Sequence, residues 1–347
     1  MANQGATGRV IGSELGFAES SIRATFDLAP CQLAWHEREI CQLTGPLLAR
    51  PAGANVLLLA NVFPRHRLPG WLVQPEGKFQ AMPTPIYNSR HIQPAFHLRY
   101  TWTGWPTDGT LFPTQPDEPF FQELDKAWAT DCLKRISTRW SADEIQLAFS
   151  TTPSVSPTLF VARAKGRLQH ALRLAGAHVR FSRKVSFRSI GDNHTADVEG
   201  YIAQQVDKEQ FVDPRFAAML KRFTVIDESV TLDQPSESNS GRYWYNLHVV
   251  LVVADRARVR NEADFEKLDR ALVGTAAKHG YQLAVRAWMP EHVHMALRGN
   301  ITESPEEIAL AIMNNTAYAM GQNAIWQRGF YAGTFSEYDV RALRGRV

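Results

Sequence analysis

The sequence predicts an α+β fold, with helices on one face of a mostly antiparallel sheet, and three observations lead to this class. With 347 residues, 44% of them apolar, the chain is long enough to bury a sizeable core and to form two or three domains. Apolar strand-like segments and amphipathic helical segments alternate along it, ending in a short helix. The whole series then occurs a second time, from about residue 241 to 347 after a first copy from about 95 to 206.

Four anchors relate the two copies. Two are apolar strands, one is a Ser-Pro pair and one is a glycine at the same distance before an Asp-Val pair: Phe96–Trp102 with Leu247–Val252, Asp143–Phe149 with Glu291–Leu297, Ser156-Pro157 with Ser304-Pro305, and Gly191 with Gly333. The spacing from the second anchor to the third is identical in both copies. We therefore interpret the chain as an internal duplication.

Helices are predicted at equivalent places in both copies. The first in each copy is expected over Glu118–Arg135 and Glu262–Lys278. Each Ser-Pro pair opens a second helix, because serine is a favourable N-cap and proline is tolerated at the first helical position. Another strand and a final short helix complete each copy.

Two short motifs carry the candidate chemistry. His292 and His294 lie two residues apart in a predicted strand, so their imidazoles point to the same face. Tyr201 and Gln205 lie four residues apart in a predicted helix, so they share one side. Two imidazoles, an amide oxygen and a phenol are groups that bind a divalent cation and attack a phosphate, although each motif alone is more often structural.

Together these motifs resemble the single-tyrosine HUH transposases of bacterial insertion sequences and their REP-associated relatives. In that family a His-hydrophobic-His strand supplies two metal ligands, and a later helix carries a tyrosine nucleophile followed four residues on by a glutamine ligand. The resemblance implies two tandem ferredoxin-like HUH domains, with His292, His294 and Gln205 holding Mg²⁺ or Mn²⁺ and Tyr201 as catalytic residue. Two imidazoles and an amide oxygen are also more consistent with these ions than with a structural zinc site, which four ligands normally close.

Each copy departs from the family pattern in a complementary way. In the first copy Glu144 and Gln146 stand where the histidines are expected, and in the second Leu343 and Val347 stand where the tyrosine and glutamine are expected. We therefore expect a covalent pseudo-dimer, monomeric as a chain, with one composite site. The alternative is that both sites have decayed, leaving a catalytically silent DNA-hairpin-binding protein or repressor.

A basic stretch precedes the tyrosine motif. The formal charge of +3 is too small to indicate nucleic-acid binding, but no acidic residue occurs between Val161 and Ile190. We expect this stretch to contact the phosphates of single-stranded DNA, for which the resemblance implies a hairpin. Its candidate DNA-binding residues are Arg163, Lys165, Arg167, Arg180, Arg183, Lys184 and Arg188.

The remaining expectations concern organisation and location. We predict an N-terminal extension of unknown role over 1–90, a first transposase-like domain over 91–206, a linker over 207–240 and a second domain over 241–347. The end of the linker, 233–241, is flexible by composition. The longest apolar run, Val56–Phe63, is too short to cross a bilayer, and no signal segment opens the chain, so a cytoplasmic protein without membrane association is expected.

Overall fold

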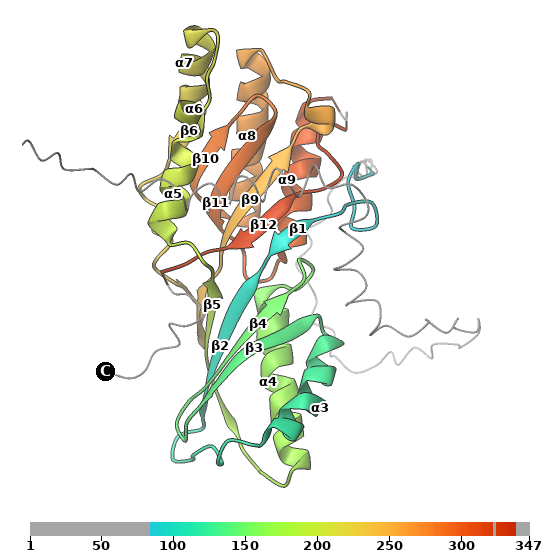
Figure 1. Cartoon of the computed structure of the whole chain (residues 1–347), viewed down its shortest axis with the longest axis vertical. Helices are drawn as coiled ribbons and strands as arrows, with labels where there is room; N and C mark the ends of the chain where they lie inside the picture. Colours follow the sequence, from blue (N-terminus) through green and yellow to red (C-terminus); the bar gives the residue numbers. More distant parts are fainter. Residues whose placement is uncertain (1–83, 322–323, 338–347) are drawn as a thin grey trace, which may run out of the picture. The chain divides into compact units, whose positions relative to one another are not determined.

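The computed structural model describes residues 84–321 and 324–337, and residues 85–347 form one compact unit. The predicted α+β class is confirmed: the described chain forms two six-stranded sheets with helices packed on them (Figure 1). Most of the predicted N-terminal extension, including the apolar run Val56–Phe63, lies outside the described residues. So do Leu343 and Val347 at the C-terminal end.

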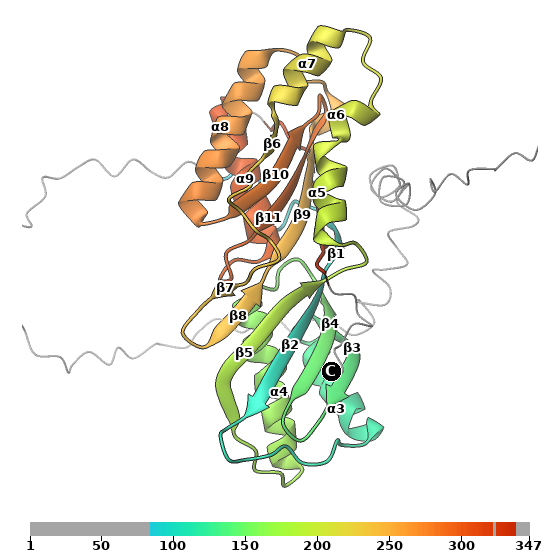
Figure 2. The same cartoon turned by 90° about the vertical axis from the view of Figure 1, so that its left-hand side faces the viewer.

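The first sheet is built mainly from the first half of the chain. Its strand order is β3-β4-β2-β5-β8-β7. The strands are β2 (Arg99–Pro106), β3 (Leu133–Trp140), β4 (Ile145–Thr151), β5 (Phe181–Ile190), β7 (Ser236–Glu237) and β8 (Gly241–Trp244). Helices α3 (Glu118–Ala129) and α4 (Pro157–Leu174) cover one of its faces (Figure 2). The ring of Phe160 on α4 packs there against the rings of Tyr100, Phe149 and Phe187.

The second sheet is built mainly from the second half. Its order is β1-β12-β9-β11-β10-β6. The strands are β1 (Ala95–His97), β6 (Thr224–Ile226), β9 (Asn246–Val252), β10 (Gln282–Trp288), β11 (His292–Arg298) and β12 (Tyr331–Thr334). Helices α8 (Glu262–His279) and α9 (Pro305–Ala319) cover one face, while α5 (Thr195–Ala203) packs on β10 and β11 from the other (Figures 1 and 2).

Each sheet receives one strand from the other half of the chain. Strand β1, which leads into β2 of the first sheet, pairs in parallel with β12 of the second sheet. Strand β8, which leads into β9 of the second sheet, pairs in parallel with β5 of the first sheet. If β6 and β7 are left aside, the two sheets have the same strand order. The strand from the other half lies at one edge, and next to it come the fourth, first, third and second strands of the half that forms the sheet.

The predicted Ser-Pro caps begin two of these helices. The hydroxyl of Ser156 accepts from the Leu159 N–H at the start of α4, and Ser304 forms a reciprocal capping box with Glu307 at the start of α9. No helix among the described residues is long and apolar enough to cross a membrane.

Two local predictions are wrong. The helix expected over 118–135 ends earlier, because Cys132 adopts a left-handed φ of 60° and the chain then enters β3. The segment 233–241, expected to be flexible by composition, contains strand β7, which pairs with β8. Before it, the chain forms α6 (Gln205–Lys208), α7 (Pro214–Arg222) and β6, which extends the second sheet by pairing with β10. Composition missed the pairing of β6 because β10 lies far away in sequence.

The two halves meet closely at Gly191, one of the predicted anchors. A Cβ atom placed there would collide with the carbonyl oxygen of Thr334 and the Cα of Phe335, both backbone atoms of the second half. We expect Gly191→Ala to lower the free energy of unfolding by about 2 kcal/mol or more, because backbone must move to accommodate the methyl group. Chemical denaturation measures this change. Gly166→Ala, at a helical glycine with open space around it, should instead raise stability by up to about 1 kcal/mol.

Candidate active site

Strand β11 presents its two predicted histidines on one face of the second sheet. Val293, Met295 and Leu297 alternate with them and join the main core, which includes residues of α8 and α9. His292 and His294 point the opposite way, and their ring centroids are 4.9 Å apart. The expectation that the imidazoles share one face is therefore confirmed.

Tyr201, from the first half of the chain, lies on this same face. Its ring centroid is 5.6 Å from that of His294, and the two rings meet edge to face. Helix α5 reaches this position because Val198, Tyr201 and Ile202 pack against alanines of β10 and β11. The structure thus brings together the tyrosine of one half and the histidines of the other, although they lie about ninety residues apart in the sequence.

The start of α5 is held by a residue of the second half. His194 occupies the N-cap position but makes no side-chain capping hydrogen bond. Instead, the backbone N–H of Thr195 donates to the carboxylate of Glu337, 3.1 Å away. Glu337 thereby satisfies one of the helix's free amide groups and fixes α5 against the half that carries the histidines.

A third histidine, which the sequence motifs did not single out, completes the cluster. His248 on β9 lies opposite Ala296, and its Nε2 is 3.0 Å from Nδ1 of His294. The two imidazoles stack with centroids 5.3 Å apart, and the ring of Tyr201 lies 6.1 Å from that of His248. The signal that could have found it is that both strands of the first anchor contain a histidine, His97 and His248, but the pairing of His248 with His294 depends on strand register.

Burial keeps the inner histidines neutral. It lowers the pKa of His248 to about 4. Burial also lowers the pKa of His294 well below its usual value, and the nearby His292, His248 and Lys208 lower it further, since they disfavour another positive charge. At neutral pH these imidazoles are therefore available as hydrogen-bond partners or ligands.

Gln205 and Lys208 surround Tyr201 from the segment after α5. A single helix through Gln205 was expected, but α5 ends at Ala203 and the short α6 begins at Gln205, so that prediction is wrong. The side chain of Gln205 is nevertheless buried beside Tyr201, with its Nε2 donating to the tyrosine carbonyl oxygen at 2.9 Å. The ammonium of Lys208, which the sequence did not single out, lies 4.1 Å from the centroid of the Tyr201 ring.

The equivalent positions of the first sheet carry no such cluster. Gln146 lies on β4 between Thr103 and Arg139, and Glu144 immediately precedes the strand. Across the described ranges, no group of three His, Cys, Asp or Glu side chains is arranged to hold a metal ion. Any cation site near Tyr201 must therefore combine the histidine pair with another kind of donor.

The seven predicted DNA-binding cations belong to the first sheet and do not line the tyrosine–histidine cluster. On α4, Arg163 and Arg167 both pair with Asp131, at 3.5 and 2.8 Å, and Lys165 donates to the carbonyl oxygen of Ser182. Arg180, Arg183 and Lys184 are exposed in and before β5, and the guanidinium of Arg188 lies 4.0 Å above the ring of Trp244. Their role in binding DNA stays a prediction.

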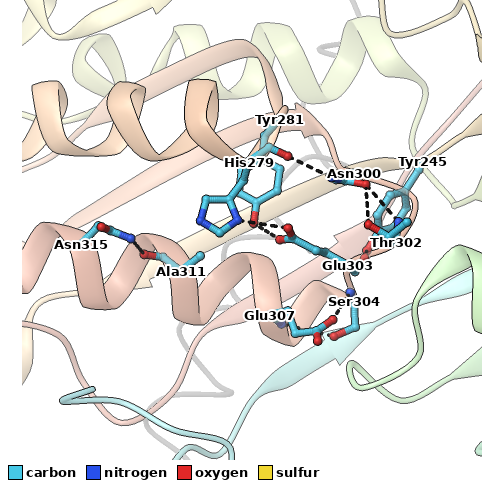
Figure 3. Close-up of polar contacts among 10 residues, drawn as sticks. All are labelled: Tyr245, His279, Tyr281, Asn300, Thr302, Glu303, Ser304, Glu307, Ala311 and Asn315. Atoms are coloured by element: carbon cyan, nitrogen blue, oxygen red, sulfur yellow. Dashed lines mark hydrogen bonds and ion pairs between the residues drawn. The ribbon is translucent and has the colours of Figure 1, made fainter. Parts of the chain in front are cut away.

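A separate polar cluster was not anticipated (Figure 3). The carboxylate of Glu303 accepts from Tyr281 and lies 3.0 Å from Nδ1 of His279, while its carbonyl oxygen accepts from the hydroxyl of Tyr245. Its members come from the end of α8, the start of β10, the start of α9 and the entrance of β9. The cluster therefore joins four elements of the second half, which is a structural role.

Comparison with known proteins supports the predicted resemblance for part of the chain. The model of the family described as "Transposase IS200 like" matches residues 242–345, the half that carries the histidines. The predicted resemblance is thus confirmed over these residues. No curated protein matches the chain.

Solved structures give weaker likenesses. A transposase candidate from Deinococcus radiodurans R1 is 19% identical, covering 26% of this chain and 79% of its own, with a TM-score of 0.25. A REP-associated tyrosine transposase bound to a REP hairpin is 15% identical, covering 27% and 57%, with a TM-score of 0.24. The regulatory subunit of aspartate kinase from Thermus thermophilus is 11% identical, covering 64% and 93%, with a TM-score of 0.16.

Proposed function

We propose that this chain nicks single-stranded DNA and transfers the cut strand through a 5′-phosphotyrosine intermediate on Tyr201. The observation that carries the proposal is the 5.6 Å separation between the rings of Tyr201 and His294, which come from different halves. The match of residues 242–345 to IS200-like transposases supports the reaction class. The active centre is composite, since neither half supplies both the nucleophile and the histidines.

The two halves are, in this proposal, ferredoxin-like copies of one domain that form a covalent pseudo-dimer. Each half follows a strand-helix-strand-strand-helix-strand order. The identical sheet orders and the reciprocal exchange of β1 and β8 support this interpretation, because two unrelated domains have no reason to exchange equivalent strands. One chain then supplies both the tyrosine and the histidines.

The donor set fits Mg²⁺ or Mn²⁺ bound by His292, His294 and Gln205. Neutral His294 can keep its Nδ1 proton on the hydrogen bond to His248 and offer Nε2 to a cation, as metal-bound histidines commonly do. Since Nε2 of Gln205 donates a hydrogen bond to the carbonyl oxygen of Tyr201, the amide oxygen of Gln205 is the atom that would bind the cation. When bound, such an ion withdraws charge from a non-bridging oxygen of the scissile phosphate.

Residues of the chain prepare the nucleophile. The packing of Tyr201 between two imidazoles restricts its ring, so that the phenolic oxygen does not have to be ordered when DNA binds. The ammonium of Lys208 lies over the face of the Tyr201 ring, a cation–π contact that further restricts the ring. Attack of the phenolic oxygen on phosphorus forms the Tyr–O–P bond and expels a DNA 3′-hydroxyl. Attack of a 3′-hydroxyl from another DNA strand on the phosphotyrosine then joins the two strands and releases Tyr201.

A catalytically silent hairpin-binding protein is the second candidate. Two imidazoles and one amide are a sparse donor set, and this observation favours it. Incubation of the protein with end-labelled single strands and Mn²⁺, followed by denaturing electrophoresis, separates the two candidates. A labelled protein band that disappears with EDTA supports strand transfer. DNA binding without any adduct over a library of hairpin-containing strands supports the silent protein.

A further inference from the structure

A short loop rich in arginine adjoins the histidine strand. It runs from Val253 to Val259 and is held at both ends by the turn before His292. The N–H of Val253 donates to the carbonyl oxygen of Glu291 at 2.7 Å, and the N–H of Val259 donates to that of Pro290 at 2.8 Å. We call this segment, together with the adjoining Arg260, the arginine loop. Because these two hydrogen bonds tie the arginine loop to Pro290 and Glu291, a displacement of the loop also displaces the residues immediately before His292.

The backbone of the arginine loop is strained. Asp255 and Arg256 adopt φ values of 52° and 51°, two consecutive left-handed conformations in residues that carry a Cβ atom. This region is unfavourable for such residues, and runs of it are rare. Backbone strain of this kind persists where the surrounding contacts enforce it, and it concentrates at binding and catalytic sites.

The loop concentrates positive charge beside the candidate active site. Arg256, Arg258 and Arg260 occur at alternate positions, and the side chain of Arg258 is 69% exposed. One carboxylate lies between two of them: the guanidinium groups of Arg256 and Arg258 are 3.9 and 3.8 Å from the oxygens of Glu291. Both ion pairs are longer than a hydrogen bond, so a group that offers closer acceptor oxygens can compete with Glu291 for these arginines.

We propose that the arginine loop binds backbone phosphates of the DNA strand next to the phosphate that is cut, and that Glu291 competes with them for Arg256 and Arg258. This inference rests on the proposed function for the identity of the strand. A phosphate carries more charge and more acceptor oxygens than the carboxylate that it displaces, and arginine binds it with two parallel hydrogen bonds. Because the loop is fixed to the turn before His292, bound phosphates are positioned relative to the histidines.

Binding is measured separately from cleavage, with Tyr201→Phe protein, a fluorescent oligothymidine and EDTA in the buffer. Arg256→Gln and Arg258→Gln should each raise the Kd about threefold to tenfold, and each should reduce the slope of log K against log salt by about 0.7. Arg215→Gln is the matched control. It removes one exposed arginine that also lies near a single carboxylate, on α7, and should leave both quantities unchanged.

Glu291→Gln should change the Kd in the opposite direction from the arginine variants. Removing the competing carboxylate should lower the Kd about twofold to fivefold, whereas an acid with a structural role alone would leave it unchanged or raise it through misfolding. Circular dichroism and thermal unfolding identify any variant that fails to fold, and Arg258→Lys, which keeps the charge but not the paired hydrogen bonds, should then lose less affinity than Arg258→Gln and keep the salt dependence.

Equal Kd values for the loop variants and the Arg215→Gln control would overturn the inference, as would weaker binding by Glu291→Gln protein that is folded. Failure of the proposed function has a different signature. In that case the unmodified chain forms no covalent adduct with any strand, while the effects of the loop variants on binding remain measurable. A chain that does not bind single strands at all overturns both proposals.

Discussion

Tyr201→Phe is expected to abolish the covalent protein–DNA adduct and to leave the fold intact. Only the phenolic oxygen is removed, and the contacts of the ring with His294, His248 and Lys208 are kept. Since no other group replaces a covalent nucleophile, the rate of cleavage should fall by about 10⁴-fold or more. Electrophoresis of the labelled adduct measures the loss, and an unchanged melting temperature shows that the variant is folded.

Tyr338→Phe is the matched control. Tyr338 is the rival nucleophile because it belongs to the half that carries the histidines, but it lies outside the described residues and five positions from the register of Tyr201. The adduct should survive this change. A phosphotyrosine peptide mapped by mass spectrometry to Tyr338 would show that the site is not composite.

The second large effect is expected from the histidines. His292→Ala and His294→Ala should each remove Mn²⁺-dependent cleavage, because a site with two imidazole ligands cannot lose one and keep a useful affinity. Mn²⁺ binding, followed by electron paramagnetic resonance, should weaken by at least about tenfold. Gln205→Ala should weaken it less, since water can replace a neutral amide oxygen.

The two histidine variants also differ in stability. His294→Ala removes the partner of buried His248 and should cost about 1–3 kcal/mol, while His292→Ala leaves that hydrogen bond in place. Cleavage is therefore compared at a temperature where both variants are folded. Glu144→Ala and Gln146→Ala, the corresponding changes in the first half, should not affect Mn²⁺ binding. Normal cleavage after the loss of both histidines would exclude the proposed mechanism.

Local sequence patterns were sufficient for much of the fold. The alternation in Glu291–Leu297 places both imidazoles on one face, because successive side chains of a strand point in opposite directions. Ser156-Pro157 and Ser304-Pro305 locate the starts of two helices, because N-cap hydrogen bonds involve only residues three positions apart. The helix predicted over Glu262–Lys278 is confirmed as α8, which ends one residue later.

Predictions failed where the deciding partner is distant. The predicted linker contains β6, which forms a strand because β10, far along the chain, lies beside it. The helix expected through Gln205 is interrupted at Gln204, although Tyr201 and Gln205 have helical spacing. The pairing of β6 with β10 cannot be inferred from a short window of sequence.

By itself, the sequence determined the α+β class, the repeated order of elements, and which half holds the tyrosine and which the histidines. Only the tertiary structure decided that β1 and β8 are exchanged, that Glu337 caps α5, and that His248 stands beside His294. The physical reason is that strand pairing and helix capping across the chain depend on register and on close approach between residues far apart in sequence. A periodic pattern fixes the direction of a side chain but not its neighbour.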